Sequence, residues 1–355
     1  MSTKYPQGII NGTPPYAQGN FSGVWTLEQL AKNYYFYGDG VANSLRFRSS
    51  ASAYLSRTPG SASNRTVWTF SVWLKRGTVG GSLDQVIFCA GDNNTRSLIA
   101  FSGGTDTLSM NNYLGGSYVT DKTTSAVFRD PSAWYHIVIS SDGATSFNVY
   151  VNGVVQTFSS STGPTSADWA FNSTFAHAIG NKTFTVGSAK YFDGYMADIN
   201  FIDGQALDPS YFGVTATATG VWSPKKYTGT YGTNGFHLNF SNGTSTTTLG
   251  YDSSGNGNNW TTNNISLTAG STYDWMIDSP TPYQGSSYGV GNYCVLMPFT
   301  ICNAVSAGYG TSAASDGNLN YSSIGSTSNS WSSFALPLSG KYYAEMRFVS
   351  LNTGS

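Results

Sequence analysis

The sequence is short of charge. Only 10% of its 355 residues are charged, and the formal net charge is -1. A nucleic-acid-binding protein neutralises phosphates with a basic surface, and this chain has no surplus of positive charge from which to build one. We therefore expect no nucleic-acid partner.

Cysteines and long apolar runs are also scarce. Cys89, Cys294 and Cys302 form no CxxC pair and stand at no metal-ligand spacing from a histidine, so we expect buried thiols and neither a disulfide framework nor a zinc site. The opening MSTKYPQGIINGTPPYAQ has no apolar signal core, and nowhere do about 18 apolar residues run together. The expected product carries no secretion signal and inserts into no membrane.

What the chain does contain favours strands. Aromatic residues make up 15% of it, with 24 tyrosines and 41 glycines, and long stretches consist of Ser, Thr, Asn and Gly. This composition suits many short strands joined by turns. The length predicts one large β domain with appendages, or two domains. The stretch GVWTLEQLAKN alone has helical spacing, and we expect residues 1–38 to form an arm that docks on a partner.

The apolar pattern has a period of two. In VWTFSVWLKRG, residues Phe70, Val72 and Leu74 share one face, which predicts a strand with one buried side. In WYHIVISSDGATSFNVYVNGVV two more alternating strands flank a turn. Asn152 and Gly153 then tolerate the positive φ angles of a type I′ hairpin.

Two later stretches also predict strands. The stretch TFTVGS is one of them, and YFDGYMADINFIDGQAL is the other. In the second, Tyr195, Ala197, Ile199 and Phe201 are expected on one face, opposite Met196, Asp198, Asn200 and Ile202. Closely spaced strands without long helices predict an all-β, antiparallel jelly-roll sandwich.

The ordered series NSLRF, AYLSRT, WTFSVWLKRG, WYHIV, YVNGVV, FTVGS and FDGYMADINF resembles the laminin-G-like, concanavalin-A-like β-sandwich family. The resemblance spans about residues 43–207. In many members an opening strand and an Asp-x-Ser-Gly-x-Gly-Asn loop come first, whereas here FHLNF and DSSGNGNNW come last. Either the domain is permuted and spans 39–268, or a second such domain begins there.

The remaining segments suggest further parts. Residues 269–290 are expected to be a linker, and 291–355 resemble the incomplete start of a second, SPRY-like sandwich through GKYYAEMRF. The whole arrangement resembles virion structural proteins of tailed marine phages, particularly tail-fibre or appendage subunits. The resemblance implies a virion location, a homo-oligomer with a trimer favoured, and contact with other virion proteins through residues 1–38.

The resemblance also raises the question of hydrolysis, because glucanases share this architecture. They carry a Glu-x-Asp-x-x-Glu strand whose two carboxylates flank the sugar. This chain has two glutamates, Glu28 and Glu345, and no such strand. His136 has no G-x-S-x-G elbow or reactive cysteine to serve. We expect a packed scaffold histidine there and no enzyme.

Calcium binding is the one cofactor hypothesis. Several laminin-G-like domains hold Ca²⁺ at the sandwich rim through oxygen ligands. The candidate ligands are Asp92 and Asn94 in AGDNNT and Asp252 and Asn256 in DSSGNGN. Neither loop has the strict alternation of an EF-hand, and turns rich in Asp and Asn also occur without ions.

Sugar binding needs an aromatic platform and nearby amides or hydroxyls. The candidates are Asn111, Asn112, Tyr113 and Tyr118 in DTLSMNNYLGGSYVTD, together with Trp73 and Trp169 on the rim. Two hypotheses stay open. One is a lectin-like module for host-surface polysaccharide, and the other is a purely structural collar, tail or decoration subunit whose Tyr and Asn residues serve turns and packing.

Overall fold

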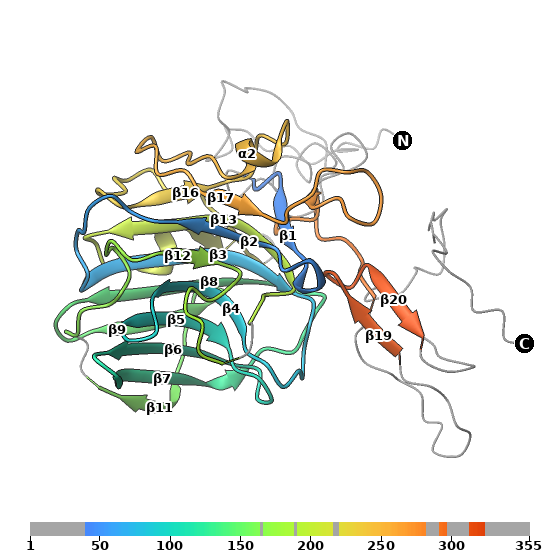
Figure 1. The fold of residues 1–355 in the computed structure, drawn as a ribbon. Helices are drawn as coiled ribbons and strands as arrows, with labels where there is room; N and C mark the ends of the chain where they lie inside the picture. Colours follow the sequence, from blue (N-terminus) through green and yellow to red (C-terminus); the bar gives the residue numbers. More distant parts are fainter. Residues whose placement is uncertain are drawn as a thin grey trace, which may run out of the picture.

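The computed structural model describes residues 40–163, 166–187, 190–215, 220–281, 291–296 and 312–323. Two eight-stranded sheets lie face to face (Figure 1), and their strands pair antiparallel. The predicted all-β antiparallel jelly-roll sandwich is confirmed. The arm 1–38, including its helical stretch, lies outside the described residues.

The first sheet runs in the order β10 (Val154–Val155), β9 (Phe147–Val151), β8 (Trp134–Asp142), β3 (Val67–Arg76), β13 (Gly194–Asp203), β1 (Ser44–Phe47) and β18 (Trp275–Met276), with β16 (Phe236–Leu238) also paired to β13. The second runs β11 (Phe158–Thr162), β7 (Ser117–Val127), β6 (Thr107–Leu114), β5 (Arg96–Phe101), β4 (Gln85–Gly91), β12 (His177–Ile179), β2 (Tyr54–Arg57) and β17 (Thr261–Asn263).

Short elements complete the described chain. They are the hairpins β14 (Gly213–Thr215) with β15 (Trp222–Pro224) and β19 (Ser312–Ser315) with β20 (Asn320–Ser323), the helix α2 (Thr246–Leu249), and the 3-10 turns η1 (Ser49–Ala51) and η2 (Pro209–Tyr211). Since β16, β17 and β18 all join the two main sheets, the described residues 236–276 belong to this sandwich.

The core lies between the sheets. Phe70, Val72 and Leu74 of β3 enter it with no exposure, as the period of two predicts. The opposite face of β3 is buried as well, because β15 and the aromatic residues around Tyr231 cover the outside of the first sheet. The expectation of one buried side is therefore too narrow.

The predicted alternation of β13 fails at its centre. Asp198 adopts a φ of 47° in a bulge, and the pairing with β3 shifts register between Ala197 and Asn200. The bulge inverts the pattern, so Tyr195 packs on the outer face whereas Ile199 packs in the core. His237 of β16 fixes the bulge through a 2.6 Å contact from Nε2 to Asp198 Oδ1.

The sandwich extends past its predicted end at residue 268. Asp274 is buried between the guanidinium groups of Arg46 and Arg48, with Nε to Oδ1 distances of 3.1 and 2.8 Å. Asp278 binds Lys75 Nζ at 2.9 Å. The predicted linker 269–290 thus contributes β18 and two buried carboxylates, and its part from 282 to 290 lies outside the described residues.

A turn between β19 and β20 packs on the same end of the sandwich. Tyr195 Oη donates to the Gly317 carbonyl at 2.8 Å, and the Leu296 N–H donates to the Asn318 carbonyl at 2.9 Å. Most of the predicted SPRY-like start at 291–355 falls outside the described residues, including GKYYAEMRF. Of the predicted buried thiols, Cys89 is buried, Cys294 is exposed, and Cys302 is not described.

Candidate functional site: a hollow on the outer face of the second sheet

His136 is a scaffold residue, as predicted. Its ring is fully buried and stacks on Trp73, with ring centroids 4.6 Å apart. Trp222 Nε1 donates to Nδ1 at 2.9 Å, so the proton of the neutral ring is on Nε2, which lies 3.0 Å from Ser71 Oγ. Burial lowers the pKa of His136 to about 3. The ring is therefore neutral at physiological pH and shielded from any substrate.

A hollow lies on the outer face of the second sheet, across β5, β6 and β7 and beside the loop 181–187. Its volume is about 200 Å³, below the range of about 300–1,000 Å³ typical of drug-sized clefts. The residues that line it are Asp84, Arg96, Leu98, Asn111, Tyr113, Tyr118, Phe184, Val186, Gly187 and Lys190.

Aromatic rings and one guanidinium form its floor and side. Tyr113 and Tyr118 meet edge to face with centroids 5.0 Å apart, and Tyr118 is 63% exposed. The Arg96 guanidinium lies 3.7 Å from the centroid of the Tyr113 ring and 4.8 Å from that of Phe184. Stacked on both rings, Arg96 is held rigidly, and Tyr118 presents open ring surface.

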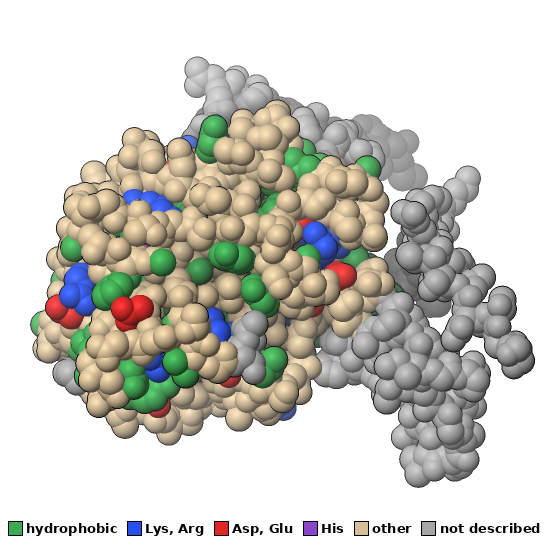
Figure 2. Space-filling model, in the orientation of Figure 1, with side chains coloured by type: hydrophobic (Ala, Val, Ile, Leu, Met, Phe, Trp, Pro, Cys, Tyr) green, Lys and Arg blue, Asp and Glu red, His purple; other side chains and the backbone are tan. Residues whose placement is uncertain are grey.

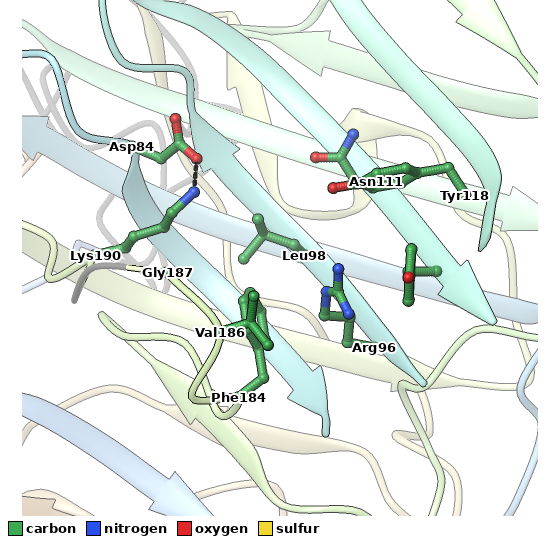
Figure 3. Close-up of a pocket in the computed structure, with 10 residues that line it drawn as sticks. Asp84, Arg96, Leu98, Asn111, Tyr118, Phe184, Val186, Gly187 and Lys190 are labelled. Atoms are coloured by element: carbon green, nitrogen blue, oxygen red, sulfur yellow. Dashed lines mark hydrogen bonds and ion pairs between the residues drawn. The ribbon is translucent and has the colours of Figure 1, made fainter. Parts of the chain in front are cut away.

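Polar groups stand at both ends of the hollow. At one end Asn111 Nδ2 donates to Asp121 Oδ1 at 2.6 Å. At the other, Lys190 forms an ion pair with Asp84, whose Oδ1 also accepts the Gly103 N–H at 2.9 Å. Figure 3 shows this ion pair at one end, Asn111, Tyr118 and Arg96 toward the other, and Leu98, Phe184 and Val186 between them.

The wall of the hollow is the stretch predicted as the strand TFTVGS. Residues 183–187 form a loop, because side chains satisfy its backbone in place of a neighbouring strand. Asn93 Oδ1 accepts the N–H groups of Thr185 and Val186, and Lys182 Nζ donates to the Val186 and Gly187 carbonyls at 2.6 and 2.8 Å. Phe184 and Val186 are thereby held at the hollow.

Three of the six predicted sugar-contact residues meet here, namely Asn111, Tyr113 and Tyr118. The other three are buried elsewhere. Asn112 points into the sandwich and bonds Ser97 and the Asp168 carbonyl, Trp169 stacks on Phe147, and Trp73 stacks on His136. The placement of Trp73 and Trp169 on the rim is wrong, since their exposed fractions are 2% and 0%.

The hollow also contains residues that no sequence motif singled out, namely Asp84, Arg96, Phe184 and Lys190. They come from three segments that strand pairing brings together. Arg96 was detectable from the outward phase of β5, because Ile99 and Phe101 of the same strand face the core. No local signal in the sequence marks the other three.

The proposed calcium ligands serve their own loops. Asp92 Oδ1 accepts the N–H groups of Asn94 and Thr95 at 2.8 and 2.7 Å. Both oxygens of Asp252 accept two hydrogen bonds each, from His237, Ser254 and Asn258, and Asn256 Nδ2 donates to the Gly232 and Gly235 carbonyls. In the described part of the chain no group of three or more His, Cys, Asp or Glu side chains is placed to hold a metal. The calcium hypothesis stays a prediction, and in this structure Asp92, Asp252 and Asn256 hold their own loops.

The face shown in Figure 2 is largely uncharged and polar, with charged and apolar side chains scattered over it. None of the helices described is long and apolar enough to cross a membrane.

Part of the chain matches the profile of a known family. The profile of the concanavalin A-like lectin/glucanases superfamily matches residues 48–210. No curated protein matches the sequence significantly.

Three solved structures are similar. A heptameric SAP-like pentraxin from Limulus polyphemus is 15% identical, with 47% of this chain and 78% of that chain covered and a TM-score of 0.35. Domain 4 of an extracellular arabinanase from Geobacillus stearothermophilus, in complex with arabinotriose, is 20% identical, with 41% and 65% covered and a TM-score of 0.33. Domains LG4-5 of the mouse laminin alpha1 chain are 16% identical, with 56% and 48% covered and a TM-score of 0.33. Residues 48–210, which include most of both sheets, are thus similar to the concanavalin A-like lectin/glucanases superfamily.

Proposed function

We propose that the sandwich binds host-surface polysaccharide through the hollow on its second sheet, and that the chain is a tail-fibre or appendage subunit of a tailed phage. The observation that carries the binding role is the convergence of Tyr113, Tyr118 and Asn111 beside a charged end. An open aromatic ring packs against the apolar face of a sugar, while the amide and charged groups take its hydroxyls.

The geometry favours binding over hydrolysis. Of the residues that line the hollow, Asp84 is the one acid, and it is engaged by Lys190. A two-carboxylate mechanism needs a second acid across the sugar. Glu28 and Glu345 both lie outside the described residues. We therefore propose that the protein is not an enzyme.

The phage role rests on the order of motifs along the chain, from the sandwich through the DSSGNGN loop to the tail segment. In this proposal residues 1–38 contact other virion proteins and the subunit forms a homotrimer. Antibodies raised against the chain should label an external appendage of the particle in electron micrographs. Label confined to the capsid or collar would favour the purely structural role.

Binding is tested by titrating the full chain with dextran, arabinan, polygalacturonate and dextran sulfate in a calorimeter. Tyr118→Ala should weaken the observed binding about tenfold or more, since exposed tyrosines at the centre of a contact dominate its energy. Tyr211→Ala is the matched control, because Tyr211 is 46% exposed and belongs to η2, far from the hollow. Equal losses in the two variants, or no binding to any polymer, would overturn the role.

A further inference from the structure

The hollow carries more positive than negative charge. Arg96 and Lys190 line it, whereas Asp84, which pairs with Lys190, is the one acid in the lining. The loop that forms the wall, NKTFTVGSAK at 181–190, contains two lysines and no acidic residue. In a chain whose net charge is -1, this local excess stands out.

Arg96 has donors to spare. Its guanidinium stacks on Tyr113 and Phe184, and its Nη1 donates to the Asn93 carbonyl at 2.6 Å. Among the described residues no carboxylate forms an ion pair with it, whereas Arg46, Arg48, Arg65, Arg76 and Arg129 each pair with an aspartate. A guanidinium has five N–H donors in a planar fork that matches a carboxylate or a sulfate.

Lys182 adds charge without an acidic partner of its own in the described chain. Its ammonium lies behind the wall, where it donates to the Val186 and Gly187 carbonyls. Burial is the largest cause that lowers the pKa of Lys182, and the nearby positive charges of Lys190 and Arg96 lower this pKa further. Lys182 is therefore repelled by both other cations, which a bound anion would relieve.

Three acids lie nearby, and each already has hydrogen-bond donors of its own. Asp92, whose pKa is lowered by hydrogen bonds from its own loop and by the charge of Arg96, accepts the N–H groups of Asn94 and Thr95. Asp84 is shared between Lys190 and the Gly103 N–H. Asp121 takes the Asn111 amide at the opposite end. Lys190 and Asp84 keep side-chain exposures of 25% and 29%, so a ligand can reach the ammonium.

We propose that the hollow selects acidic glycans, an inference that rests on the binding role proposed above. One sugar ring packs on Tyr118, and its carboxylate or sulfate is held by Arg96 or by Lys190. Charge-assisted hydrogen bonds of this kind are about twice as strong as neutral ones, so an acidic ring is bound in preference to a neutral one.

The first test compares each acidic polymer with its own neutral form. Polygalacturonate is paired with its carboxyl-reduced form, and dextran sulfate with dextran, in titrations of the full chain. The acidic member should bind at least about tenfold more tightly, and its affinity should fall as salt rises from about 0.05 to 0.5 M. The polygalacturonate and dextran sulfate arms distinguish a carboxylate from a sulfate ligand.

The second test changes the charges one at a time. Lys190→Gln and Arg96→Gln should each weaken the acidic polymer about tenfold, whereas Lys225→Gln removes the same charge from an exposed residue beyond β15 and should have no effect. Asp84→Asn should strengthen binding several-fold, because it frees Lys190 and keeps the acceptor for the Gly103 N–H. This gain cannot arise from misfolding.

The outcomes separate the two proposals. Equal affinity for acidic and neutral forms, lost in Tyr118→Ala, would overturn the acidic selectivity and leave the binding role intact. No binding to any of the polymers would overturn both. Tighter binding in Lys190→Gln, or weaker binding in Asp84→Asn, would overturn the selectivity as well.

Discussion

The buried His136 makes stability depend on pH in a way that can be worked out in advance. An unfolded histidine titrates near about 6.5, whereas burial lowers the pKa of His136 in the fold to about 3. Between these values the unfolded chain binds the extra proton, so stability falls as pH drops. The expected loss is about 1.4 kcal/mol per pH unit from this one residue, or about 2 kcal/mol at pH 5.

Replacing His136 with Phe separates this effect from packing. The variant keeps a ring on Trp73 but leaves Ser71 Oγ and Trp222 Nε1 without their partner. At pH 7 we expect it to be less stable than the wild type by about 1–3 kcal/mol. At pH 5 the difference should shrink by about 2 kcal/mol and can change sign, because the variant no longer has the titrating ring.

Urea denaturation at pH 7 and pH 5 measures both differences. His177, whose pKa burial lowers to about 4, and Asp193, whose pKa burial raises to about 6, titrate in both proteins and cancel. Ser71→Ala is the control, since it removes a partner of His136 but retains the titrating ring, and its deficit should be similar at both pH values. A stability deficit of the His136→Phe variant that is equal at pH 7 and pH 5 would refute the assignment of a buried, neutral histidine.

Three other predictions concern the scaffold. Asp274→Ala should destabilise the fold by about 3–5 kcal/mol in urea denaturation, because it leaves Arg46 and Arg48 buried without their acid; an effect below about 1 kcal/mol would show that residues 270–281 are not part of the sandwich. Gly153→Ala should lower the melting temperature, since its φ is 78° and a Cβ would lie 2.8 Å from the Trp222 ring; unchanged melting would contradict the type I′ hairpin. Calcium at 1 mM should leave the melting temperature unchanged relative to EDTA, because the loop oxygens of Asp252 already accept two hydrogen bonds each; a rise lost in Asp252→Asn would restore the calcium site.

The sequence predicted the parts of the fold that local pattern controls. Alternation placed Phe70, Val72 and Leu74 in the core. Asn152 and Gly153 both have the positive φ of a type I′ turn, at 50° and 78°, as their dipeptide indicates. Asn111, Tyr113 and Tyr118 were found because one short segment holds all three.

The features that the sequence did not predict depend on contacts between segments that lie far apart in the chain. Trp73 was expected on the rim because its strand face reads as polar, but Trp222 and the buried His136 cover it from distant segments. The phase change of β13 depends on His237, which meets Asp198 only in the fold. Arg96 and Lys190 reach the hollow through strand pairing and a loop, so neither was marked by a motif.

The central claim is that the hollow on the second sheet is the glycan contact. The most direct measurement is a crystal structure of the full chain soaked with an oligosaccharide of whichever polymer binds it. We expect a sugar ring packed on Tyr118, with its acidic group within hydrogen-bond distance of Arg96 or Lys190. Clear density for the oligosaccharide at another site, with the hollow left to solvent, would contradict the account.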